Sequence, residues 1–454
     1  MPTGFAAIPD APAYRLVNAR APLALTTTSG LATGADGLAR IDLTVADGRI
    51  ASIVAAGAFT LDEDLPALDL DGGLLLPRLV DLHTHLDKGH IWPRRPNPDG
   101  TFASALENAG IDREECWTAA DVRTRMDFAI RCALAHGTGA IRTHLDCRGK
   151  QTAITWPVFA EMREAYAGRV ALQGVALFPL DTVLDGPEEF RDVVATTARH
   201  GGVLGGVTFT GRAPDARTDA ALDRLMEAAG ANGLDLDLHV DESNSPEART
   251  LERVADAALR NRFAGKILCG HCCSAALMGE AELDRLLPKL AEARIAVVSL
   301  PLCNMYLQDR VPGRTPRWRG VAPLHEMARV GIPVAVASDN TRDPFYAYGD
   351  LDMLEVFREA TRILQLDHSG PDWVRAVAAT PADLMGLDRH GRLEAGDPAD
   401  LLLTRARSWN ELGSRPQTDR TVLVGGRPID TTPPDYRELD ALVTPPARAA
   451  RGAP

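Results

Sequence analysis

The chain has 454 residues, of which 45% are hydrophobic and 24% charged, and its formal net charge is −13. This length suits one large domain with a smaller one, and the acidic balance argues against binding nucleic acid or an anionic membrane. The seven cysteines are odd in number and scattered, which does not suggest a disulfide framework. No apolar run reaches the roughly 18 residues of a membrane span, and the first residues carry no secretory pattern. We therefore expect a cytoplasmic enzyme with reduced thiols.

Both ends of the chain predict short strands and turns. Alternating apolar and polar residues indicate strands at 14–19, 41–45, 400–403 and 420–427. Asp47-Gly48 is a turn of the kind that closes hairpins. We expect residues 1–73 and 388–454 to form one small β-sandwich domain. The tail after Asp430, rich in Pro, Ala and Arg, is expected to be poorly ordered.

The middle of the chain, residues 74–387, alternates apolar strand-like runs with helical patterns. The eight runs are 74–85, 137–146, 171–179, 201–209, 234–242, 266–272, 295–301 and 332–339. Helical patterns between them include 121–135, 219–231 and 281–293. Such alternation predicts βαβ units and a parallel sheet. Eight units in roughly 265 residues fit a (β/α)8 barrel, with the catalytic chemistry expected at the C-terminal ends of its strands.

Reactive side chains recur where these runs end. They are His83 and His85 in the first run, His144 in the second, His239 and Glu242 in the fifth, His271 in the sixth and Asp339 in the eighth. Since side chains alternate along a strand, His83 and His85 point the same way. If the barrel forms, all of these groups converge on one mouth.

The convergent residue types predict a metal centre. Three imidazoles, from His83, His85 and His239, and the Asp339 carboxylate form a nitrogen and oxygen shell suited to one Zn²⁺ or Fe²⁺. Such a metal lowers the pKa of a bound water towards neutrality. Glu242 is then predicted to move the water's proton to a substrate nitrogen, with His271 close to the same water. The run 201–209 contains no lysine that could bridge two metals, which favours a single ion.

Each of these assignments has an alternative. His239 and Glu242 can form a pair at the rim that merely hydrogen-bonds, and Asp339 can cap a following helix. His144 is either a hydrogen-bond partner of the site or a packing residue.

Two other clusters are interpreted as structural. The run Cys269-Gly270-His271-Cys272-Cys273 superficially resembles a zinc knuckle, but no second Cys or His pair lies at suitable spacing. We interpret these thiols as small core residues. Lys88 is expected to line the mouth or to pair with Asp87.

In this order the motifs resemble the amidohydrolase superfamily, and within it the cytosine deaminase-like group. The resemblance covers nearly the whole chain. It rests on 83–87, 142–146, 239–242, His271, 304–310, 317–320, Asp339, 342–345 and 393–401. It implies a mononuclear deaminase whose metal is held by His83, His85, His239 and Asp339.

The resemblance also implies the roles of the remaining residues. Glu242 would protonate the ring nitrogen of a cyclic amidine, while His271 and Asp339 activate and orient hydroxide. The hydroxide attacks the amine-bearing carbon, and ammonia leaves.

Two departures from cytosine deaminases concern the substrate. Those enzymes usually carry Phe-Pro-Gln after the third strand, where this chain places Leu180, and His-Asp-Asp at the eighth, where it has Ser338-Asp339-Asn340. The second run is more similar to that of the triazine-processing N-isopropylammelide isopropylaminohydrolase, as is Asp87-Lys88. Because losing one polar contact to a heterocycle edge changes specificity strongly, we expect a substrate other than cytosine.

The sequence thus predicts a metal-dependent hydrolytic deaminase of a small nitrogen heterocycle, a pyrimidine, triazine or related cyclic amidine, that releases ammonia or an amine. Substrate contacts are predicted at Leu180, Gln308, Asn340 and Phe345, each of which can equally be loop packing. One alternative is a cyclic-amide hydrolase, against which Glu242 argues; another is a barrel that binds a ligand without turnover. The expected partner is the heterocyclic substrate, with no nucleic acid and no membrane, and a homo-oligomer stays open.

Overall fold

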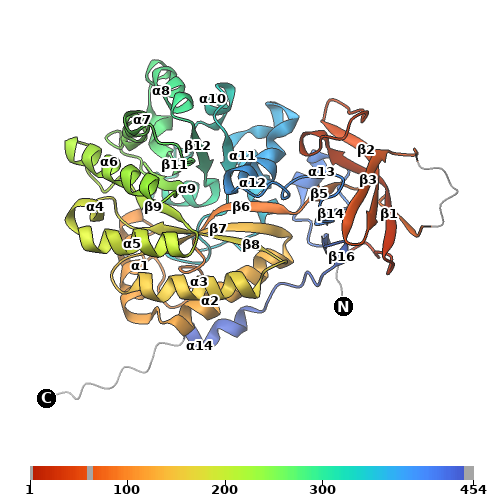
Figure 1. Cartoon of the computed structure of the whole chain (residues 1–454), viewed down its shortest axis with the longest axis horizontal. Coiled ribbons are helices and arrows are strands. Elements are labelled where there is room, and N and C mark those ends of the chain that lie inside the picture. The colour runs from red at the N-terminus through yellow and green to blue at the C-terminus, as the bar shows by residue number, and fades with distance from the viewer. Residues whose placement is uncertain (1–3, 59–64, 444–454) are drawn as a thin grey trace.

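Eight parallel strands form the main sheet of the molecule, and each pairs with the strand that follows it in the chain. The computed structural model describes residues 4–58 and 65–443. The strands are β6 Leu79–Thr84, β7 Thr138–Asp146, β8 Ala171–Leu177, β9 Val203–Val207, β10 Leu236–Val240, β11 Ile267–His271, β12 Ile295–Ser299 and β13 Val334–Val336. Helices surround this sheet (Figure 1). Each predicted run contains one of these strands, so the predicted (β/α)8 barrel is confirmed.

The outer layer of the barrel is helical. It contains α1 Phe102–Cys116, α2 Ala119–Ala135, α3 Gln151–Ala165, α4 Thr182–Asp185, α5 Pro187–Arg199, α6 Ala216–Ala231, α7 Thr250–Asn261, α8 Glu280–Glu292, α9 Pro301–Leu307, α10 Leu324–Arg329, α11 Met353–Leu364 and α12 Ala379–Met385. The short 3-10 helices are η1 Leu23–Leu25, η2 Cys273–Leu277, η3 Leu366–His368 and η4 Pro371–Val377. Side-chain caps start several helices; Asp215, for example, accepts from two backbone N–H groups at the start of α6. Within the described residues, no helix is long and apolar enough to cross a membrane.

The barrel closes between its first and last strands at the level of the predicted site. The backbone N–H of Asp339 donates to the carbonyl of His83 over 2.9 Å, and Thr84 and Asp339 form a parallel bridge. One residue earlier, the N–H of Ser338 donates to the Asp81 carboxylate over 3.1 Å, across 257 positions of sequence. The strand pairing that closes the barrel therefore brings the first and last predicted ligands together.

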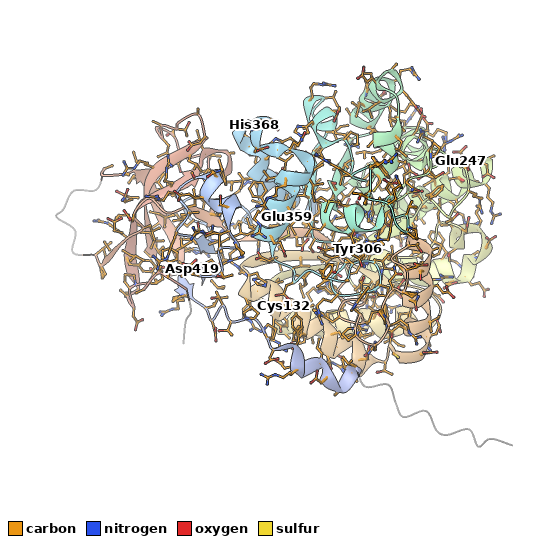
Figure 2. The ribbon with its side chains drawn as sticks, turned by 180° about the vertical axis from the view of Figure 1, so that it is seen from behind. Cys132, Glu247, Tyr306, Glu359, His368 and Asp419 are labelled. Carbon is orange, nitrogen blue, oxygen red and sulfur yellow. The ribbon has the colours of Figure 1, made fainter. Side chains whose placement is uncertain are left out.

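A second body is built from both ends of the chain. One of its sheets has the order β3-β2-β1-β4 and the other β16-β15-β14-β5. The strands are β1 Ala13–Pro22, β2 Leu38–Ala46, β3 Arg49–Ala55, β4 Ala67–Asp69, β5 Leu75–Pro77, β14 Leu401–Leu403, β15 Thr421–Val424 and β16 Arg427–Pro428, joined by helix α13 Trp409–Ser414. Leu16 and Leu43 of one sheet share a buried core with Leu75, Leu401 and Leu423 of the other. This is the predicted β-sandwich, which lies at the end of the molecule marked by Asp419, opposite Glu247 (Figure 2).

The first predicted run, 74–85, is two strands and not one. β5 pairs with β14 in the small sheet, whereas β6 pairs with β7 in the barrel. Between them Arg78 is buried, its N–H donates to the Asp400 carbonyl over 3.0 Å, and its guanidinium donates to the Arg169 carbonyl over 2.7 Å. The change from one sheet to the other could not be predicted, because both strands lie within one continuous apolar run. The division into 1–73 with 388–454 and 74–387 stays a prediction.

The segment after Asp430 is ordered up to residue 443, which corrects the expectation for this tail. It forms η5 Tyr436–Leu439 and α14 Asp440–Val443. Leu439 packs on Phe128 and Cys132 of α2, and the Tyr436 hydroxyl donates to Asp350 over 2.8 Å. These contacts with the barrel order a segment whose composition alone predicts disorder. Residues 444–454 lie outside the described residues.

Candidate active site

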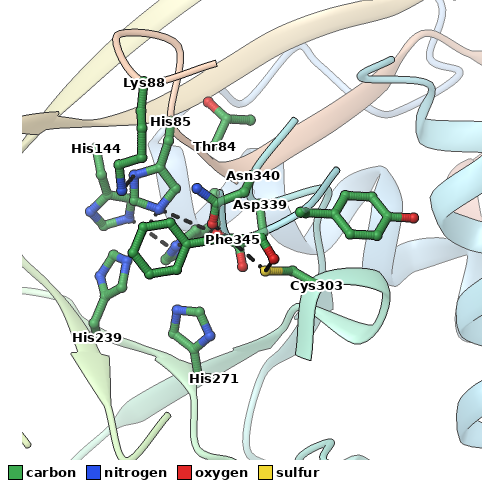
Figure 3. A network of polar contacts seen from close by, with 12 residues as sticks. Thr84, His85, Lys88, His144, His239, His271, Cys303, Asp339, Asn340 and Phe345 are labelled. Atoms are coloured by element: carbon green, nitrogen blue, oxygen red, sulfur yellow. Dashed lines mark hydrogen bonds and ion pairs between the residues drawn. The ribbon is translucent and has the colours of Figure 1, made fainter. Parts of the chain in front are cut away.

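Four side chains meet at the mouth of the barrel (Figure 3). His83, His85 and His239 are buried, and one ring nitrogen of each lies within 4.8 Å of the others. Nε2 of His239 is 3.3 Å from Nε2 of His85. Oδ1 of Asp339 is 3.2 Å from Nε2 of His85 and 3.6 Å from Nε2 of His83. The structure thus brings together all four residues predicted as metal ligands.

The donor set fits a divalent cation. Nε2 of His83 and both carboxylate oxygens of Asp339 are buried and have no hydrogen-bond partner among the described residues. Buried polar atoms are normally satisfied, and one cation at this point would bind Nε2 of His83 and the Asp339 oxygen nearest to the histidines. Burial lowers the pKa of His83, His85 and His239 well below the usual value, so the imidazoles are neutral, the form that binds metals. Burial raises the pKa of Asp339 to about 7, and an adjacent cation would favour its carboxylate.

Two of the site residues adopt an uncommon backbone conformation. His271 has φ 69° and Asp339 has φ 67°, in the left-handed region that non-glycine residues seldom occupy. Residues held in such conformations cluster at functional sites, where the surrounding structure imposes them. Asp339 caps no helix, because the next helix, α11, begins after Asp352, whose side chain accepts from the N–H of Leu354. The helix-cap alternative is therefore wrong.

Glu242 and His271 share one amide partner. Nδ2 of Asn304 donates to Nδ1 of His271 over 2.9 Å and to Oε1 of Glu242 over 3.4 Å. Because Nδ1 of His271 accepts, its ring proton lies on Nε2, a buried atom with no hydrogen-bond partner in the described part of the chain. Burial and the neighbouring Asp339 charge raise the pKa of Glu242 well above its usual value. Glu242, whose side chain is 13% exposed, is therefore suited to hold a proton at neutral pH.

His144 stands behind the first histidine. Its Nε2 lies 3.1 Å from Nδ1 of His83, where it can accept the ring proton of a histidine that ligates through Nε2. Asp237 lies 3.6 Å from the same nitrogen and pairs with Arg142 at 2.9 Å. This geometry favours the hydrogen-bond-partner alternative for His144.

Lys88 is buried and faces the site. Its Nζ lies 3.5 Å from Nδ1 of His85 and 4.7 Å from the centre of the Phe345 ring. Two hydrogen bonds fix the loop that carries Lys88. The Asp87 carboxylate accepts from the N–H of Asp146 over 2.7 Å, and Arg125 donates to the Asp87 carbonyl. Lys88 therefore lines the mouth, and Asp87 has other partners.

The four residues predicted to contact substrate fall into two pairs. Asn340 and Phe345 adjoin the site, since Asn340 is buried directly after Asp339 and the centre of the Phe345 ring lies 4.7 Å from Nζ of Lys88. Leu180 belongs to the main hydrophobic core. Gln308 is buried, and its N–H donates to the Asn304 carbonyl over 2.8 Å. All four stay predictions as substrate contacts.

The cysteine cluster formed by Cys269 of β11 and by Cys272 and Cys273 after it is structural. Cys269, Cys272 and Cys273 are fully buried free thiols. None belongs to a group of metal-ligating atoms among the described residues. Burial raises the pKa of each, so they stay protonated. They are core residues, as the spacing predicted.

Sequence reasoning missed two residues that support the site. Asp237 lies within a strand, two positions before His239, and Asn304 lies in the short helix α9. Asp237 could have been found from the sequence. It is a charged residue inside an apolar strand and lies two positions before the predicted ligand His239, hence on the same face of the strand. Asn304 is the first residue of the motif 304–310, which contributed to the family resemblance, but no role in the site was predicted for it.

A (β/α)8 barrel whose mouth gathers three neutral histidines and a carboxylate is the architecture of a metal-dependent hydrolase. The Amidohydrolase family model matches residues 118–430, and the chain belongs to this family. The pterin deaminase of Rhizobium rhizogenes is 52% identical over 443 residues, which are 98% of this chain and 100% of the relative. The predicted superfamily is thereby confirmed.

Two solved structures share the architecture at lower identity. The 5-methylcytosine deaminase of Klebsiella pneumoniae, liganded with 5-fluorocytosine, has a TM-score of 0.76 and 25% identity, covering 91% of this chain and 97% of that chain. The N-isopropylammelide isopropylaminohydrolase of Burkholderia multivorans has a TM-score of 0.72 and 26% identity, covering 92% and 98%. These belong to the two groups whose motifs the sequence resembles.

Proposed function

We propose that this protein is a metal-dependent pterin deaminase, which replaces the exocyclic amino group of a pterin by oxygen and releases ammonia. The observation that carries the choice of substrate is the 52% identity to a pterin deaminase across 98% of the chain. The reaction class is supported independently by the neutral histidines, Asp339 and Glu242 at one mouth.

The chemistry of a pterin explains what the site must supply. Its amino group is attached to a carbon between two ring nitrogens, as in a cyclic amidine, and this carbon is a weak electrophile. Protonation of a neighbouring ring nitrogen makes the carbon attackable by water, and the tetrahedral carbon then expels ammonia. A buried acid next to the ring and a base for the attacking water are therefore required.

The proposed metal site is formed by His83, His85, His239 and Asp339. Three imidazoles and a carboxylate suit Zn²⁺ or Fe²⁺, and either ion, when bound, supplies a water of low pKa as the nucleophile. Glu242 carries the proton that the ring nitrogen needs, because burial and the Asp339 charge favour its protonated form. Asp339 accepts a proton from the attacking water through an oxygen with no other hydrogen-bond partner among the described residues. It passes this proton to the amino group, which leaves as ammonia, while the Glu242 carboxylate takes the hydroxyl proton as the carbonyl forms.

His271 would orient and stabilise the attacking oxygen. Burial lowers its pKa to about 3, so the ring is neutral, and Asn304 keeps its proton on Nε2. A neutral N–H donor fixed in place before the reaction stabilises the charge that develops on oxygen without reorganising. Asn304 is a positioning residue in this scheme, since it acts through His271 and Glu242.

Lys88 would recognise the pterin carbonyl. A histidine that ligates through Nε2 carries its proton on Nδ1, so Nδ1 of His85 cannot then accept from the Lys88 ammonium, 3.5 Å away. The ammonium is left as a donor towards the pocket, beside the Phe345 ring, against which a flat heterocycle can pack. The seven free cysteines support a reducing compartment such as the cytoplasm.

A substrate panel tests the proposed function. Purified protein, with its metal measured by elemental analysis, is assayed for ammonia release from pterin and cytosine and for isopropylamine release from N-isopropylammelide, before and after chelation. Metal-dependent deamination of pterin at a higher kcat/KM than turnover of the other two supports the proposal. Preference for cytosine or for the triazine would overturn the choice of substrate, and ammonia release that survives complete metal removal would overturn the mechanism.

A further inference from the structure

A second group of metal-binding atoms lies beside the four proposed ligands. Glu242, Cys303 and Asp339 each offer one atom within 4.8 Å of the other two, and this group contains no histidine. Cys303 is the third residue of α9 and is fully buried. Figure 3 shows its thiol turned towards the Asp339 carboxylate.

Packing explains only part of the position of Cys303. Its neighbours in a small apolar cluster include Ala105, Ala109 and Leu307. Its sulfur, however, lies 3.7 Å from Oδ1 of Asn340 and 4.0 Å from the Phe345 carbonyl. In both contacts the thiol is the donor. Because the sulfur also lies within 4.8 Å of a carboxylate oxygen of Glu242 and of Asp339, it is placed to act as a ligand once it loses its proton.

The ligand atoms of Glu242, Cys303 and Asp339 favour a different ion from the one that the three histidines favour. One sulfur and carboxylate oxygens bind Zn²⁺ readily, and the sulfur adds preference for softer ions such as Cd²⁺. Both oxygens of Asp339 are buried and have no hydrogen-bond partner in the described part of the chain. One oxygen can therefore face the histidines while the other faces Cys303 and Glu242.

We propose that Glu242, Cys303 and Asp339 form a second, inhibitory site for a thiophilic divalent cation such as Zn²⁺ or Cd²⁺. Binding forms a metal–sulfur bond and metal–oxygen bonds, and it releases to solvent the thiol proton of Cys303 and any proton on the Glu242 carboxyl. With its carboxylate bound to the ion, Glu242 cannot transfer a proton to the substrate ring. Excess zinc therefore inhibits the enzyme that one equivalent of metal activates. The inhibitory consequence rests on the proposed function, whereas the ion site itself does not.

The test titrates Cd²⁺ into protein that already holds one equivalent of metal. Ammonia release and the near-ultraviolet charge-transfer absorption of a cadmium–thiolate bond are followed in the same samples. The absorption should rise and the activity fall over the same concentration range. Cys303→Ala should lose the absorption and bind Cd²⁺ about tenfold or more weakly, the scale on which site residues affect metal affinity. Cys132→Ala is the matched control, because Cys132 is a buried thiol in the outer helix layer (Figure 2) and should titrate like the parent protein.

A second measurement needs no variant. X-ray absorption at the zinc edge should show nitrogen and oxygen neighbours for the first equivalent and a sulfur neighbour at about 2.3 Å once a second is added. A second equivalent without sulfur, or a Cys303→Ala protein that titrates like the parent, would overturn the inference. If the protein did not deaminate pterin, the proposed function would fail, yet the absorption and the zinc–sulfur distance would still decide on the second site.

Discussion

Replacing Glu242 by glutamine separates proton transfer from binding at this site. The amide keeps the size of the carboxylate and can still accept from Asn304, which donates to Oε1 over 3.4 Å. It cannot carry the proton that burial and the Asp339 charge hold on Glu242. Metal content and folding should therefore stay unchanged while the chemical step slows.

The expected loss of rate in Glu242→Gln follows from the role of Glu242 as a general acid. A positioned general acid or base contributes about 10²–10⁴-fold to the rate, which corresponds to about 3–5 kcal/mol of transition-state stabilisation. Because the Glu242 side chain is 13% exposed, bulk water has little access to replace it, and we expect a loss towards the upper end of this range. The loss should fall on kcat, with little change in KM.

The assay combines steady-state ammonia release with elemental analysis and thermal unfolding. Glu247→Gln is the matched control, since Glu247 is exposed on the same loop after β10 (Figure 2) and should leave kcat unchanged. A Glu242→Gln protein that keeps its metal and retains more than about a tenth of the parent kcat would refute the role of Glu242, because a general acid contributes at least about 10²-fold.

Three further predictions address the residues around the metal site. His144→Ala removes the acceptor of the His83 ring proton, so metal affinity should fall about 10–100-fold in a competition with a chelator, and unchanged affinity would contradict this. Asp237→Ala removes the carboxylate that lies 2.9 Å from the buried Arg142 guanidinium, which keeps the neutral acceptors Gln173 and Leu384 but not the opposite charge. The free energy of unfolding in urea should fall by about 3–5 kcal/mol. If the unpaired Arg142 charge causes the loss, the double variant Asp237→Ala with Arg142→Met should be more stable than Asp237→Ala alone. A double variant that is equally unstable would contradict this explanation. Lys88→Met should raise KM for pterin without changing metal content, and an unchanged KM would remove Lys88 from substrate recognition.

Much of the architecture follows from patterns that are local in the sequence. Each barrel strand is an apolar run of a few residues, and the chemistry is expected at its C-terminal end, so His83, His239 and Asp339 could be grouped from spacing alone. The barrel rule supplies the long-range step, because it brings strand ends together without any contact being known.

The parts that escaped prediction depend on tertiary contacts. The boundary between β5 and β6 lies inside one apolar run and is set by which strands pair with each half. The segment 435–443 is ordered by packing of Leu439 on Phe128, which its composition does not reveal. Asn304 joins the site through the position of α9, since Nδ2 lies 2.9 Å from His271.

The central claim is that water replaces the amino group of a pterin at this mouth. The most direct measurement is the mass spectrum of the product formed in water labelled with heavy oxygen. Hydrolytic deamination predicts an intact bicyclic product with one labelled oxygen on the carbon that carried the amine, and one ammonia for each product molecule. A ring-opened product, or an intact one without the label, would contradict it.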